Sequence, residues 1–134
     1  PPLAFRLPAL PSFTTLYARL PAHIGGRRPR MQNLSPQELK SLLDQGQVYL
    51  LDVRQAEELE IASIAGAVHI PLNELPARLG ELDPQKPVVA LCHHGVRSEM
   101  AGRVLERNGF TQVAHLSGGI DAWSQAVDPT VPRY

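Results

Sequence analysis

The chain has 134 residues, 43% of them hydrophobic and 19% charged, which is enough apolar material for one ordinary domain without disulfides or metal. No apolar run reaches the roughly 18 residues of a membrane span, so we expect no membrane association. Residues 1–30 hold five arginines and no acid, and the rest has 8 basic and 13 acidic residues, a net charge of −5 that argues against nucleic-acid binding.

Residues 1–30 are rich in proline and arginine and differ from everything that follows. We predict that they are a leader outside the domain and that the domain covers residues 31–134. Two interpretations of the leader stay open. It is either an artificial or read-through extension, or an arginine-rich targeting peptide that lacks the compact apolar stretch of a secretory signal.

From Met31 onward the pattern alternates between helix and strand. Residues 35–38 (SPQE) form a capping box with proline at the first helical position, and Gly46 ends the helix that follows. The expected strands cover residues 48–53, 68–70, 88–91 and 113–116, and the further helices cover residues 75–82, 98–108 and 120–126. This alternation predicts an α/β fold, a doubly wound and mostly parallel sheet of four to five strands with helices on both faces. In such a sheet the working site lies beyond the carboxyl ends of the strands.

The chain has a single cysteine, Cys92, so it cannot form an internal disulfide or a cysteine-rich zinc site. No pair of histidines has convincing metal-ligand spacing, and we expect neither a metal nor a cofactor. His69 and His115 lie on strand patterns and are interpreted as satisfied core or edge residues. A lone thiol fits a reducing compartment, and we expect a cytoplasmic protein. Cys92 is then either a small buried residue or a reactive thiol.

Residues 88–98 (VVALCHHGVRS) place Cys92 between a buried strand and the start of a helix. A helix N-terminus carries unpaired amides and partial positive charge, and a curled loop aims further amides inward. Gly95 gives the loop its conformational freedom, Arg97 adds a positive charge and Ser98 adds a hydroxyl donor. These features favour a thiolate, and later a persulfide anion, over an inert core thiol.

The pattern Cys92-x-x-Gly95-x-Arg97-Ser98 after a buried strand resembles the active-site loop of the rhodanese family. Other segments resemble that family in the same order along residues 31–134: Asp52-Val53-Arg54 with Glu58, residues 64–71 (IAGAVHIP), residues 116–123 (LSGGIDAW) and the tail 127–134, which is similar to a bacterial single-domain subgroup. Residues 62–65 (ASIA) depart from the family's Gly-His-Ile-Pro, which concerns local turn geometry outside the loop.

The resemblance implies a thiosulfate sulfurtransferase in which Cys92 is the nucleophile. The Cys92 thiolate takes the outer sulfur of a donor such as thiosulfate, and an acceptor then removes this sulfur. The acceptor is cyanide or a thiol, and a thioredoxin-like protein is one such thiol. A monomer is expected. The residues implied for the anion cradle and substrate binding are His93, His94, Gly95, Val96, Arg97 and Ser98. The residues implied for structural support are Asp52, Arg54 and Glu58. For His93 and His94 the alternative of plain exposed loop residues stays open.

Two other functions remain as alternatives. A Cys-Arg phosphatase or arsenate reductase also surrounds an oxyanion with cysteine and arginine, but its loop has five residues between them, and Cys92 and Arg97 are separated by four. A non-catalytic binding or redox-sensing module would typically lack the cysteine or the loop charges, both of which this chain keeps.

Overall fold

The computed structural model describes residues 31–134, so the predictions made for residues 1–30 lie outside the described residues. Within that part of the chain, five parallel strands form one sheet in the order β1-β5-β4-β2-β3. The strands are β1 (Gln32–Leu34), β2 (Tyr49–Asp52), β3 (Val68–His69), β4 (Val88–Leu91) and β5 (Val113–Leu116). The predicted parallel α/β fold is therefore confirmed.

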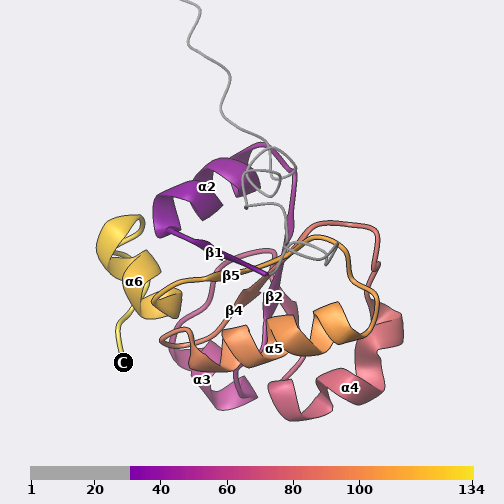
Figure 1. The fold of residues 1–134 in the computed structure, drawn as a ribbon. Coiled ribbons are helices and arrows are strands. Elements are labelled where there is room, and N and C mark those ends of the chain that lie inside the picture. Colours follow the sequence, from indigo (N-terminus) through magenta and orange to yellow (C-terminus); the bar gives the residue numbers. More distant parts are fainter. Residues whose placement is uncertain (1–30) are drawn as a thin grey trace, which may run out of the picture.

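Helices join successive strands and pack on the two faces of the sheet, and Figure 1 shows α5 running across the front of the strands with α2 and α6 together at the left. The helices are α2 (Pro36–Asp44), α3 (Ala56–Ile61), α4 (Leu75–Arg78), α5 (Val96–Arg107) and α6 (Gly119–Ala126), with the 3₁₀ turns η2 (Leu72–Glu74) and η3 (Leu79–Glu81) on either side of α4. The predicted capping box is present at α2, where the Glu38 amide donates to Ser35 Oγ (3.1 Å) and the Ser35 amide donates to Glu38 Oε1 (2.9 Å).

The core consists of two apolar clusters, one on each face of the sheet. One cluster contains α2 and α6 side chains, and the other contains α4 and α5 side chains. Side chains of β4 alternate between them, with Val89 and Leu91 in the first and Val88, Ala90 and Cys92 in the second. Because successive strand residues point to opposite faces, this alternation directs the Cys92 side chain towards α5.

Four elements differ from the sequence-based expectation. The helix expected over residues 75–82 is instead the short α4 followed by the 3₁₀ turn η3. Strand β1 was not predicted because it is a three-residue edge strand with two polar members, and such a segment has no visible period. Helix α3 was missed because it has no fully buried side chain and hence no apolar stripe. Helix α5 begins at Val96, two residues earlier than expected, so Arg97 and Ser98 belong to its first turn.

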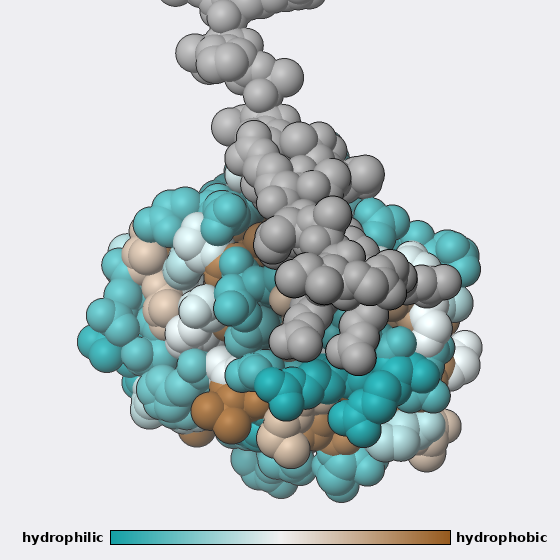
Figure 2. All heavy atoms as spheres, in the orientation of Figure 1, coloured by the Kyte–Doolittle hydropathy of each residue, from teal (hydrophilic) through white to brown (hydrophobic). Residues whose placement is uncertain are grey.

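Most of the surface that can be seen in Figure 2 is hydrophilic, and apolar residues form small separate spots on it. The large hydrophobic side chains exposed among residues 31–134 are Ile61, Val68, Val96 and Met100. No helix in this part of the chain combines the length and the apolar character that crossing a bilayer requires.

Candidate active site

The loop that carries Cys92 leaves the sheet beside the loop that follows β2. Strands β2 and β4 are neighbours, and the Val53 amide donates to the Leu91 carbonyl (3.0 Å), which extends their pairing to the carboxyl edge. On the other side, the first amides of α6 donate to the loop: Ile120 N–H to the Cys92 carbonyl (2.8 Å) and Asp121 N–H to the His93 carbonyl (3.2 Å). The loop is thus held between the sheet and the α6 N-terminus.

Cys92 is 1% exposed, and its sulfur has both polar and apolar neighbours. The Gly95 amide donates to Sγ at 3.0 Å, and the Cys92 thiol contacts Ser98 Oγ at 3.4 Å. Gly95 has a φ of +110°, which a residue with a side chain rarely adopts, and this conformation turns its amide back to the sulfur. Of the amides of residues 93–98, the Gly95 amide is the one that bonds Sγ in this structure.

Arg97 lies at the end of the loop in a bidentate ion pair with Glu58. The two guanidinium-to-carboxylate distances are 2.7 and 2.8 Å, with the side chains 32% and 19% exposed. Hydrogen bonding from Arg97 is the main reason that the pKa of Glu58 falls from 4.5 to about 2. Arg97 is therefore oriented by α3 and not directly by the sulfur.

The predicted support residues form one continuous network. Arg54 is fully buried and forms a bidentate pair with Asp52, with nitrogen–oxygen distances of 3.0 and 2.6 Å. Nη2, one of the two nitrogens in this pair, also donates to the carbonyl of Ala62 (2.8 Å), and Nη1 donates to the hydroxyl of Tyr134 (2.9 Å). That hydroxyl donates to Glu58 (2.9 Å). A buried guanidinium needs these partners to offset its lost hydration.

The two loop histidines lie in different surroundings. His93 is half-buried, and its ring stacks on Tyr134 with 3.8 Å between the ring centroids and an angle of 5° between the planes. Its Nε2 atom is buried and has no hydrogen-bond partner in the described part of the chain. His94 is exposed and lies 3.8 Å from the His93 ring. Sequence analysis did not find the contact of Tyr134 with His93, because no local signal links two residues that lie so far apart in the sequence.

Ser98 connects the thiol to a buried histidine. Its hydroxyl lies 2.9 Å from His115 Nδ1 and 3.1 Å from the Gly95 carbonyl. His115 Nε2 in turn bonds the side-chain oxygen of Asn33. Burial lowers the pKa of His115, although the charge of Glu99 opposes this. Asn33 was not singled out from sequence, since it belongs to the strand that the pattern did not show.

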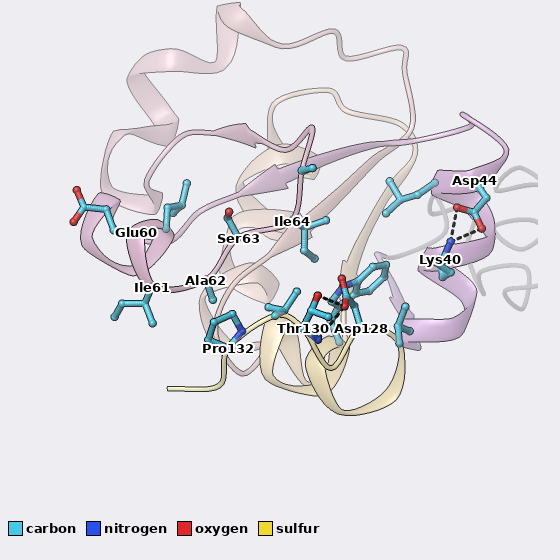
Figure 3. A pocket seen from close by; sticks show the side chains of 16 residues that line it. Lys40, Asp44, Glu60, Ile61, Ala62, Ser63, Ile64, Asp128, Thr130 and Pro132 are labelled. Atoms are coloured by element: carbon cyan, nitrogen blue, oxygen red, sulfur yellow. Dashed lines mark hydrogen bonds and ion pairs between the residues drawn. The ribbon is translucent and has the colours of Figure 1, made fainter.

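A cavity of about 650 Å³ in residues 31–134 lies away from this loop. Figure 3 shows it between α2, the segment that follows α3 and the C-terminal tail, with Lys40 and Asp44 paired on α2 and Thr130 bonded to Asp128. Cys92 does not line it. The side chains of these two pairs are bonded to each other, and the candidate nucleophile lies elsewhere.

The model of the rhodanese-like domain matches residues 35–126, more than half of the chain. The chain belongs to the rhodanese-like domain family. The match includes the Cys92 loop and ends in α6.

Several known proteins resemble this rhodanese-like domain. The putative sulfur carrier protein YrkF of Bacillus subtilis (strain 168) is 44% identical over 75 residues, which cover 56% of this chain and 40% of YrkF. A rhodanese-like domain protein from Staphylococcus aureus is 30% identical with a TM-score of 0.67, covering 78% of this chain and 99% of that one. The human single-domain sulfurtransferase TSTD1 is 28% identical with a TM-score of 0.64, covering 70% and 96%.

The rhodanese-like domain spans only 24% to 40% of the length of the first four curated relatives that it matches. Proteins named as sulfurtransferases are among those that the domain resembles.

Proposed function

We propose that this chain is a sulfurtransferase that carries sulfane sulfur on Cys92 as a persulfide. The observation that carries the proposal is the position of Sγ at the carboxyl end of β4, 3.0 Å from the Gly95 amide and 3.4 Å from the Ser98 hydroxyl. The Gly95 amide donates to the sulfur, and such a donor stabilises a negatively charged sulfur more strongly than it stabilises a neutral thiol.

The reaction has two steps. The Cys92 thiolate attacks the outer sulfur of a donor such as thiosulfate, the donor's sulfur–sulfur bond breaks, and sulfite leaves with the bonding electron pair. A thiolate or cyanide then attacks the outer sulfur of the persulfide and releases the Cys92 thiolate. The acceptor is a small thiol, cyanide or the cysteine of a thioredoxin-like protein. Transfer through a covalent intermediate predicts ping-pong kinetics.

The remaining loop residues have supporting roles in this proposal. The ion pair with Glu58 holds Arg97 at the edge of the loop, where its charge attracts an anionic donor. His93, His94 and the backbone around Val96 line the approach to the sulfur. Because Cys92 is 1% exposed, donor binding includes a local movement of the residues over the sulfur.

Loop length supports sulfur over phosphate as the bound group. Four residues separate Cys92 from Arg97, and the first turn of α5 begins directly after Gly95. A tight turn of this kind surrounds one sulfur atom more closely than a phosphate group. The thiol and the charged side chain are both present, which favours catalysis over a binding module.

The mass of the intact protein after thiosulfate treatment tests the proposal. We expect a gain of one sulfur atom that cyanide reverses and that Cys92→Ser abolishes. The test is unambiguous because Cys92 is the only cysteine in the chain. Folded wild-type protein that gains no sulfur would contradict the proposal, and turnover of p-nitrophenyl phosphate in the same sample would favour a phosphatase instead.

A further inference from the structure

Three side chains form an unbroken line of hydrogen bonds behind the Cys92 sulfur. The Cys92 thiol contacts Ser98 Oγ (3.4 Å), Ser98 Oγ lies 2.9 Å from His115 Nδ1, and His115 Nε2 bonds Asn33 Oδ1. Strand pairing in the sheet brings Asn33 and His115 together and places His115 near Cys92. Asn33 and His115 are register partners in β1 and β5, and His115 is paired with Ala90, two residues before Cys92. Residues two apart in a strand share a face, so all these side chains lie on the α5 side.

Asn33 decides which nitrogen of His115 carries the proton. The amide oxygen of Asn33 is an acceptor, so His115 Nε2 must donate to it. In a neutral imidazole the other nitrogen, Nδ1, then has a free lone pair and accepts from Ser98. His115 is 5% exposed, and a buried imidazole is neutral in the resting protein because burial lowers its pKa.

Ser98 has one hydroxyl hydrogen and three polar neighbours: Sγ, His115 Nδ1 and the Gly95 carbonyl. With a neutral thiol, Cys92 donates to Ser98 and Ser98 donates to His115. With a thiolate, the same hydrogen turns to the sulfur, which leaves His115 Nδ1 without a donor. Once Nδ1 is protonated, it can donate to Ser98 Oγ, and all three groups are paired again. Ionisation of Cys92 is therefore coupled to protonation of His115.

A solvent-exposed hollow reaches His115 but not the sulfur. A cavity of about 280 Å³ is lined by Asn33, the loop residues after Cys92, Glu99 and His115, and Cys92 is not among its lining residues. His115 therefore borders this hollow, whereas Sγ is enclosed, so we expect water to reach the ring of His115 more readily than the sulfur. The ionisable groups around this ring among residues 31–134 are Cys92 beyond β4, His94 in the loop and Glu99 on α5, which is paired with Arg103 (2.7 Å).

We infer that Ser98 and His115, oriented by Asn33, form a proton relay that carries the proton of Cys92 to His115. The thiol proton moves to Ser98 Oγ while the Ser98 hydroxyl proton moves to His115 Nδ1. The products are a thiolate, a neutral hydroxyl that donates to it and an imidazolium, and no atom is oxidised or reduced. The inference rests on the proposed function for its purpose, since the thiolate is the form that attacks the sulfur donor.

The pH dependence of Cys92 alkylation tests the relay in the full chain. Iodoacetamide reacts with the thiolate, and this chain has one cysteine, so the midpoint of the rate against pH reports Cys92 ionisation alone. In His115→Asn the side chain still bonds Ser98 but accepts no proton, and we expect the midpoint to rise by about one pH unit, a tenfold slower reaction below it. Asn33→Asp stabilises the imidazolium, and we expect the midpoint to fall.

Opposite shifts separate a relay from a merely structural effect, which would move both variants in the same direction. The control is His69→Asn, the same exchange on β3, where the ring bonds the Arg54 carbonyl (2.7 Å) and has no contact with Ser98. We expect its midpoint to match the wild type. Unchanged midpoints in both relay variants, or shifts of equal sign, would overturn the inference.

Two further measurements keep the outcome decisive. If circular dichroism shows that His115→Asn does not fold, the midpoint of Asn33→Asp and the ring ¹⁵N spectra of wild-type His115 test the relay instead. The spectra are informative because the relay requires an unprotonated Nδ1 in the resting protein. Cys92→Ser should remove the ionisation step at high pH from the His115 titration. Alkylation needs no sulfur donor. A protein that gains sulfur but shows unshifted midpoints rejects the relay alone, and shifted midpoints without sulfur gain reject the proposed function alone.

Discussion

Replacing Gly119 by alanine should lower the free energy of unfolding more than the same substitution at a glycine that has free space around its Cβ position. Gly119 begins α6 with a φ of +63°, and a Cβ there would lie 2.2 Å from the His93 carbonyl oxygen and 2.6 Å from that of Cys92. Cβ contacts under 3.0 Å are essentially never seen, so the loop or the helix must move by about 0.8 Å. These two carbonyls accept the first amides of α6, which is why the backbone comes so close.

The cost has two parts, and the chain contains a control that separates them. Gly46 has nearly the same φ, +64°, and nothing within 4 Å of its Cβ position. Alanine at position 46 therefore introduces only the left-handed backbone strain, about 1 kcal/mol of unfolding free energy. Alanine at position 119 adds the displacement of packed backbone, about 1–3 kcal/mol more, for a total loss of about 2–4 kcal/mol.

Urea unfolding of wild type, Gly46→Ala and Gly119→Ala measures both values. We also expect faster alkylation of Cys92 at high pH in Gly119→Ala, because the displaced loop uncovers a sulfur that is otherwise enclosed. Equal stability losses in the two variants would refute the reasoning, since they differ in contacts and not in backbone conformation.

Arg54→Leu leaves the buried Asp52 carboxylate without its partner and should lower the free energy of unfolding by about 3–5 kcal/mol. Arg78→Leu, at an exposed and solvent-screened ion pair, should cost much less, and similar losses in the two variants would contradict a buried brace. Because Arg97 lowers the pKa of Glu58 from 4.5 to about 2, this pair stabilises the fold fully above pH 4.5 and is lost as the pH falls towards 2. The stability difference between wild type and Glu58→Gln should therefore shrink over that range in urea titrations, and a constant difference would argue against the pairing.

The local features of the site could be predicted from sequence because each depends on a few adjacent residues. The alternation of apolar runs and capped helices indicated the α/β sheet, and the position of Cys92 after a buried strand placed it at the carboxyl edge. The need for a glycine at position 95 was predicted for the same reason, and the structure shows the positive φ that this glycine adopts in the turn from β4 into α5. The alternation of side chains along a strand and the geometry of a turn both depend on residues that are close together in the sequence.

Only the tertiary structure decided which distant groups meet behind and around the thiol. Asn33 contacts His115 across 82 residues because β1 joins the sheet beside β5, and Tyr134 reaches Glu58 across 76 residues. No local rule selects these pairs, because the order of the strands in the sheet depends on how the whole chain buries the two apolar clusters. The sequence by itself determined that Cys92 lies at a strand end facing a helix; packing decided which side chains surround it.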